Sequence, residues 1–154
     1  MKNRKIEKNY IYVGFGFPIV LHDVPMVEIR GKWALDINYN VFQRVVLLLL
    51  AHLPAPLTGN HMRFIRKYFA LKLVDFGQKL NVTHPAVLKW EKRGDNPANI
   101  NPMTERQIRL FILDSLLDND KDFRNAYKKI MKQEFSLKKT TPLHIDAQCE
   151  LVAI

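Results

Sequence analysis

The chain has 154 residues, 47% of them hydrophobic, and 24 Lys and Arg against 15 Asp and Glu give a net charge of +9. This hydrophobic fraction excludes a disordered basic arm and supports one folded domain or two small ones. The single Cys149 excludes an internal disulfide, and no Cys or His spacing of a structural zinc site occurs. The longest apolar run, residues 45–51, is too short to span a bilayer, and no signal-peptide core occurs, so we expect a cytoplasmic protein without membrane contact.

Four short segments near the N-terminus are rich in β-branched and aromatic residues and are separated by Gly and Pro. This pattern predicts a three-stranded meander. The Gly14-Phe15-Gly16 motif lacks the third glycine and the following helix of a nucleotide-binding loop, so it favours a bulge or a turn. The predicted segments span residues 10–15, 19–22, 27–30 and 32–37.

A buried helix is predicted to follow the meander. The sequence NVFQRVVLLLLAHL begins at Asn40, which stands in capping-box spacing with Gln43. The helix is hydrophobic nearly all round, which predicts burial on several sides at a subunit or domain interface. We therefore expect residues 1–56 to provide a surface for dimerisation or for a partner.

Two short amphipathic helices around a tight turn are predicted between Leu71 and Gly94. Asn81 tolerates the left-handed backbone of a sharp turn. Thr83 can cap the second helix, and Pro85 then falls in its first turn, where no intrahelical N–H bond is lost. The apolar positions follow three- and four-residue steps: Leu71, Phe76, Leu80, Val82, Val87, Leu88 and Trp90.

These residues resemble a known DNA-binding motif, the helix-turn-helix of lambda-repressor-like (XRE, Cro/C1-type) regulators. The preceding LTGNHMRFIRKYFA, residues 57–70, is similar to the entry helix of a subgroup that includes antitoxin-type regulators. The two matches are contiguous and cover about a quarter of the chain. The motif is matched by Leu71, Phe76, Gly77, Leu80, Asn81, Val82, Thr83, Val87, Trp90, Glu91 and, one residue late, Gly94.

Three residues depart from the family's pattern. Lys72 replaces the usual Ser or Thr cap, Leu73 replaces a Gln that commonly braces the DNA backbone, and Asn81 replaces Gly. The resemblance implies an α+β protein with a lambda-repressor-like helical core in residues 57–135. The departures alter the usual phosphate clamp at the start of the first helix of the pair.

Two more helices and a strand are predicted after Gly94. Asn101 with Pro102 favours a helix start, so helices are expected over residues 102–117 and 121–135. The final segment, residues 136–154, is predicted as a C-terminal strand, because apolar and polar residues alternate over residues 142–154 as in a half-buried strand. This strand can join a sheet in the same chain or in a second protomer. The expected inward residues are Met103, Ile108, Phe111, Ile112, Ser115 and Leu116, then Phe123, Tyr127, Ile130 and Met131.

The positive charge is concentrated around the resembling segment. Residues 60–93 hold eight Lys and Arg against two acidic residues. This excess predicts a polyanionic partner and salt-dependent binding, whereas a merely solvated face would intersperse acids. A membrane surface also attracts cations, but the helix lacks a large exposed apolar face.

The resemblance and the charge together predict a set of DNA-contacting residues. Lys89 is the expected guanine contact, His84 enters the groove, and Ala86 can meet a thymine methyl group. Trp90 and Phe76 are expected in the core. The full expected set is Lys72 and Thr83 on phosphates, His84, Ala86 and Lys89 in the groove, and Lys92 and Arg93 on the flanking backbone.

Two functions follow as expectations. The first is a repressor that binds double-stranded DNA at a palindromic operator as a homodimer. The second is an antitoxin that occludes a toxin protein and autoregulates its operon. An enzyme, a cofactor or a metal site is not expected, because the histidines are scattered and Cys149 stands at an inward position. His22 and His144 could meet at a sheet edge, although polar strand positions facing water explain them better.

Overall fold

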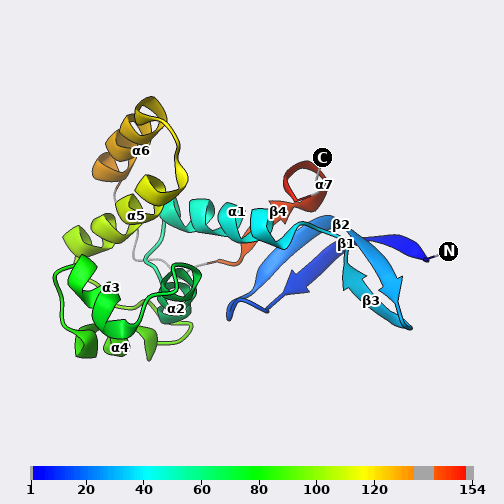
Figure 1. The fold of residues 1–154 in the computed structure, drawn as a ribbon, viewed down its shortest axis with the longest axis horizontal. Coiled ribbons are helices and arrows are strands. Elements are labelled where there is room, and N and C mark those ends of the chain that lie inside the picture. Colours follow the sequence, from blue (N-terminus) through cyan, green and yellow to red (C-terminus); the bar gives the residue numbers. More distant parts are fainter. Residues whose placement is uncertain (1, 134–140, 152–154) are drawn as a thin grey trace. The chain divides into compact units, whose positions relative to one another are not determined.

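The computed structural model describes residues 2–133 and 141–151 and has the predicted α+β class. Its elements follow one another as Figure 1 shows. Along the chain they are β1 (Arg4–Tyr12), β2 (Ile19–Ile29), β3 (Lys32–Leu35), α1 (Tyr39–Ala51), α2 (Gly59–Tyr68), α3 (Leu73–Lys79), α4 (His84–Glu91), α5 (Pro102–Leu116), α6 (Asp120–Lys132), β4 (Leu143–Asp146) and α7 (Ala147–Glu150).

The chain divides into two compact units. The first comprises the described parts of residues 1–46 and 142–154, and the second those of residues 47–141. The division falls within α1, while the domain borders predicted after residues 56 and 135 stay a prediction. We call the two parts the sheet unit and the helical unit.

The sheet unit is built around β2. The strand β1 pairs antiparallel along β2, and β3 pairs antiparallel with its last four residues, so the predicted meander is confirmed. Two predicted strands merge into the single strand β2, which runs through Pro25. Pro25 lies opposite Ile6, and its carbonyl accepts the Asp36 N–H at 2.8 Å, so Pro25 takes part in the sheet as an acceptor although it has no N–H to donate.

The predicted C-terminal strand is correct only in part. β4 pairs in parallel with residues 19–22 of β2 in the same chain, so the sheet is mixed and not purely antiparallel. The next four residues form α7 and not a strand. The Asp146 carboxylate accepts the Gln148 N–H at 3.1 Å, and the buried Ala147 and Leu151 stand four residues apart, as on a helix. Residues 136–140 and 152–154 of the predicted strand lie outside the described residues.

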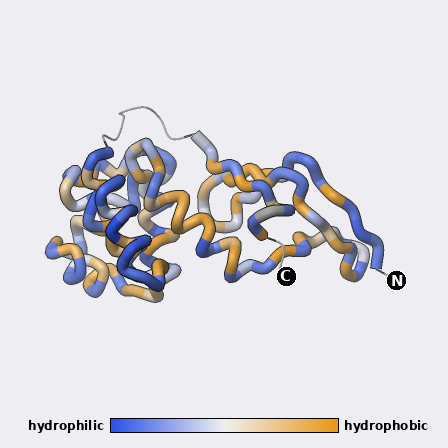
Figure 2. Tube along the Cα trace, turned by 90° about the horizontal axis from the view of Figure 1, so that it is seen from above, coloured by the Kyte–Doolittle hydropathy of each residue, from blue (hydrophilic) through white to orange (hydrophobic). Residues whose placement is uncertain are grey.

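The helix α1 is capped by a different residue than predicted. Asn38 Oδ1 accepts the N–H groups of Asn40 and Val41 at 3.0 and 3.2 Å. Asn40 is therefore already helical, and the expected capping box with Gln43 is wrong. The helix is mainly hydrophobic, as its colour in Figure 2 shows. Side chains buried within the single chain are Phe42, Val46, Leu47, Leu50 and Ala51.

A buried arginine organises the helical unit. Arg109 on α5 has no exposed surface, and Glu105 Oε1 lies 3.7 Å from its Nη2 atom. The same Oε1 accepts the Leu57 N–H at 2.7 Å. Burial raises the pKa of Glu105 and lowers that of Arg109 to about 10. The guanidinium donates to the carbonyls of Leu50, Ala51, Leu53 and Ala55 at 3.1, 3.4, 2.6 and 2.8 Å.

The helices α5 and α6 begin close to the predicted positions, but part of their predicted inward face is wrong. Asn101 caps α5 as expected, and α6 ends at Lys132. Met103 is 57% exposed and Tyr127 is 43% exposed, because α5 turns Glu105 and Arg109 inward and α6 packs on it through Ala126 and Ile130. Ser115 and Met131 are also exposed, whereas Ile108, Ile112 and Leu116 are buried as predicted.

Candidate nucleic-acid interface

The helices α3 and α4 meet at the predicted tight turn. Asn81 has a φ angle of 57°, and the Val82 N–H donates to the Gly77 carbonyl at 2.8 Å. A Cβ atom on Gly77 would lie 2.7 Å from the Val82 carbonyl oxygen, so only glycine lets the turn approach this closely. Thr83 caps α4, since its side chain accepts the Ala86 N–H at 3.4 Å. The turn and the cap are confirmed.

The start of α3 has no side-chain cap. Lys72 occupies the cap position in extended backbone, and its side chain makes no capping hydrogen bond. A lysine side chain has no hydrogen-bond acceptor and so cannot cap a helix start. Lys72 is instead an exposed cation beside the first turn of α3.

The inner face of the helix pair follows the predicted apolar stripe with one exception. Phe76, Val87 and Trp90 are buried as expected. Leu88 is 38% exposed, so its predicted place in the core is wrong. The reason is that α4 turns Val87, Trp90 and Glu91 inward, and Leu88 lies about 100° around the helix axis from Val87, outside this buried face.

An ion pair joins α2 to the end of α4. Arg66 binds Glu91 with two donors, Nε to Oε2 at 2.7 Å and Nη2 to Oε1 at 2.9 Å, and Glu91 is only 3% exposed. Arg63 Nε also lies 3.5 Å from Glu91 Oε1. A Cβ atom on Gly59 would lie 2.5 Å from the Trp90 carbonyl oxygen, so α2 packs tightly against this end of α4.

This ion pair changes the distribution of charge inferred from the sequence. Two of the eight cations in residues 60–93, Arg63 and Arg66, are held by Glu91. The sequence offered two signals for this pair, the glutamate that follows Trp90 and the two arginines of α2. Arg66, the nearer arginine, precedes Glu91 by 25 residues. The motif match alone did not indicate that they meet.

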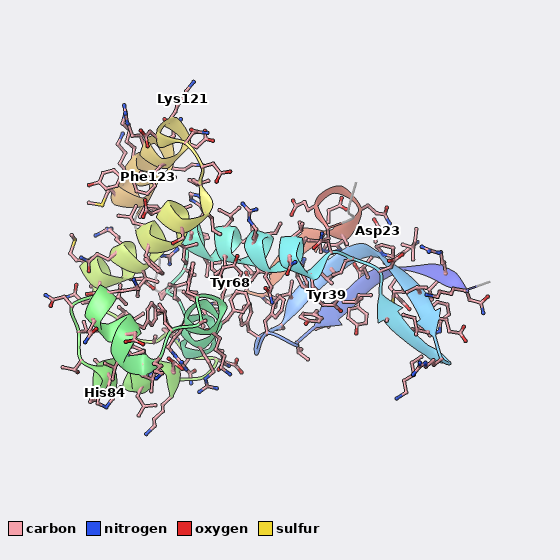
Figure 3. The ribbon with its side chains drawn as sticks, viewed as in Figure 1. Asp23, Tyr39, Tyr68, His84, Lys121 and Phe123 are labelled. Carbon is pink, nitrogen blue, oxygen red and sulfur yellow. The ribbon has the colours of Figure 1, made fainter. Side chains whose placement is uncertain are left out.

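The predicted DNA-contacting residues lie on the outer side of α3 and α4. Figure 3 shows His84 at the outer edge of the helix pair. Arg93 Nε donates to the Pro97 carbonyl at 3.1 Å, and the ion pairs among the described residues do not include Lys72, Lys89 or Lys92. The exposed members of the set are Lys72, Thr83, His84, Lys89, Lys92 and Arg93, and Ala86 is half-buried. Their contact with DNA stays a prediction.

His61 has a structural role that the sequence interpretation left unassigned. Its Nδ1 atom accepts the Thr58 N–H at 3.1 Å, while Thr58 Oγ1 accepts the His61 N–H at 3.1 Å. The pair forms a capping box with histidine in place of glutamate or glutamine. Burial lowers the pKa of His61 from 6.5 to about 4. The sequence signal for this capping box was the position of His61, three residues after Thr58.

The two strand histidines meet, so the less favoured of the two interpretations is correct, although the contact itself is exposed to water. His22 Nε2 lies 2.8 Å from His144 Nδ1, and the two stacked rings have their centroids 5.1 Å apart. His22 Nδ1 is also 2.9 Å from Asn9 Oδ1. The parallel pairing of β4 with β2 brings the two residues together within the sheet unit.

Three further findings bear on the class of protein. The described residues hold no group of three or more His, Cys, Asp or Glu side chains placed to bind a metal ion. None of the helices in residues 2–133 and 141–151 has the length and apolar content to cross a bilayer. Comparisons with protein-family models, curated proteins and solved structures gave no match to this chain.

Proposed function

We propose that the protein is a sequence-specific DNA-binding transcriptional regulator, most simply a repressor, that binds a palindromic operator as a homodimer. The observation that carries this proposal is the outer face of α4. A capped helix after a tight turn presents His84, Lys89 and Lys92 to solvent, while its other face is fixed by the buried Trp90 and Glu91. A rigid cationic helix of this kind suits the major groove of DNA.

Each exposed residue has a role in this proposal. Lys89, in the middle of the outer face, contacts guanine O6 or N7. Lys72 and Thr83, at the starts of the two helices, hold phosphates, and Lys92 and Arg93 follow the flanking backbone. His84, in the first turn, enters the groove.

Homodimerisation follows from the small number of base pairs that α4 of one protomer can contact. One short helix contacts only a few base pairs, whereas a two-fold axis places a second copy in the next major-groove turn, about 34 Å away. Within one chain, five side chains of α1 are buried while Val45, Leu48 and Leu49 stay half-buried, and β4 pairs with β2. The strand β4 therefore does not have to be shared between protomers for the sheet to form.

A gel-shift titration with DNA from upstream of the protein's own gene tests the proposal. Lys89→Ala should weaken binding to this DNA about tenfold and leave binding to random-sequence DNA nearly unchanged, since one base contact supplies about 1–3 kcal/mol of discrimination. Lys92→Ala should weaken both DNAs alike and reduce the salt slope by about one.

The matched control is Lys121→Ala on α6. Lys121 is an exposed lysine of the same unit, and Figure 3 shows it far from His84. This variant should bind both DNAs as the wild type does. Equal losses for Lys89→Ala and Lys121→Ala would show that non-specific charge explains the binding and would remove the assignment of Lys89.

An antitoxin is the second candidate function. It is favoured by the sheet unit, which has no part in the α3–α4 pair and exposes Ile6, Ile11 and Val13 along β1 and the turn after it. Co-expression with the product of an adjacent toxin-sized gene distinguishes the two functions. Rescue of growth by the protein, lost in Ile11→Asp but retained in Lys89→Ala, supports toxin occlusion.

A further inference from the structure

The outer face of α4 contains one apolar side chain among polar and cationic ones. Leu88 is 38% exposed. His84 stands one turn before it and Lys92 one turn after it, so the three share one side of the helix. Lys89 follows on the neighbouring side and is also exposed. An exposed leucine thus lies within the surface that the proposed function places against DNA.

The major groove offers one apolar group to such a side chain. Of the four base pairs, only those that contain thymine present a methyl group on the major-groove edge. Cations such as Lys92 are attracted to the phosphates that line the major groove. This attraction holds α4 in the groove, with its exposed side facing the base edges. Leu88, which lies between His84 and Lys92 on this side of the helix, is then removed from water against the methyl group.

Ala86 is less suited to this contact, although the sequence favoured it. It is half-buried, and its N–H is bonded to Thr83. Leu88 follows it two positions later, so the two side chains point roughly 160° apart around the helix axis. We infer that Leu88 is a specificity-determining residue that packs on the 5-methyl group of a thymine in each half-site. This inference rests on the proposed function.

The test replaces each thymine of a specifically bound duplex by deoxyuridine, which removes only the methyl group. For the wild type, one position in each half-site should cost about fourfold in affinity, the factor that burial of one methyl-sized group gives. Leu88→Ala should bind the thymine and deoxyuridine duplexes equally at that position. Leu88→Met, which keeps an apolar side chain of similar volume, should retain most of the difference.

The matched control is Met131→Ala on α6. Met131 has the same exposed fraction as Leu88, 38%, and α6 lies apart from α4 in Figure 1. This variant should keep the full fourfold effect. Equal thermal midpoints and equal binding to random-sequence DNA show that Leu88→Ala is folded.

The outcomes separate this inference from the proposed function. A fourfold effect of deoxyuridine that persists in Leu88→Ala overturns the inference, because another residue then meets the methyl group. Specific binding without any effect of deoxyuridine also overturns it and leaves the proposed function standing. A protein that selects no DNA sequence at all contradicts both.

Discussion

At the scale of single residues, Arg109 shows how much of the helical unit depends on one charged side chain. Its guanidinium binds four carbonyls at and after the end of α1, where the helix dipole is negative. The sequence interpretation placed α5 by its apolar stripe and assigned no role to Arg109, and arginine is rarely fully buried. Met103 was therefore assigned inward, and the helix is in fact turned to bury Arg109.

Replacing Arg109 should destabilise the protein strongly. Arg109→Met keeps an unbranched side chain but leaves the four carbonyls and the buried Glu105 carboxylate without the guanidinium. Removing one partner of a buried ion pair costs about 3 to 5 kcal/mol. Urea denaturation, analysed for the midpoint and the slope, measures this loss in the free energy of unfolding.

The control for this variant is Arg124→Met. Arg124 is an exposed arginine on α6, and a surface substitution of this kind changes the free energy of unfolding by about 0.5 kcal/mol or less. The structural role of Arg109 is contradicted if the two variants unfold at the same urea concentration.

At the scale of elements, the helix starts were predictable where the cap is local. Thr83 and Asn101 cap α4 and α5 as their spacing predicts, because the capping hydrogen bond spans only two or three residues. Asn40 was the wrong choice for α1, since Asn38 is also a good cap and lies nearer the true start. The cap of α2 was missed because its third residue is His61 and not Glu or Gln.

The capping box of α2 predicts a pH-dependent stability. His61 accepts the Thr58 N–H only as the neutral imidazole, and burial lowers its pKa from 6.5 to about 4. Between these values the unfolded chain binds a proton that the folded chain does not. The contribution of neutral His61 to the free energy of unfolding is therefore complete above pH 6.5. It is lost as the pH falls toward 4, and the loss is about 3 kcal/mol.

His61→Gln isolates this effect. Glutamine can accept the same N–H in a capping box but does not titrate. Denaturant unfolding at pH 7.5, 6, 5 and 4 should show the wild type losing stability relative to the variant across this range. Parallel stability curves for the two proteins would rule out His61 as the titrating group.

At the scale of the whole molecule, the sequence predicted what local pattern determines and missed what distant contacts determine. The α+β class, the meander and the α3–α4 turn follow from residues close together in the chain. The parallel pairing of β4 with β2 joins segments more than 120 residues apart, and α7 replaces a strand through the Asp146 cap. In the candidate site, the cap was predictable, but the Arg66–Glu91 pair and the outward side of Leu88 depend on how α2 packs against α4.

The proposal that α4 reads DNA in a two-fold symmetric dimer is tested most directly by in vitro selection of bound duplexes from a random pool. The account predicts an enriched palindrome with about ten base pairs between half-site centres, a spacing that measures symmetry and specificity together. Lys89→Ala, selected in parallel, should relax the sequence at one position of each half-site. A pool that shows no enriched sequence, or one enriched for a single asymmetric site bound by a monomer, would contradict the account.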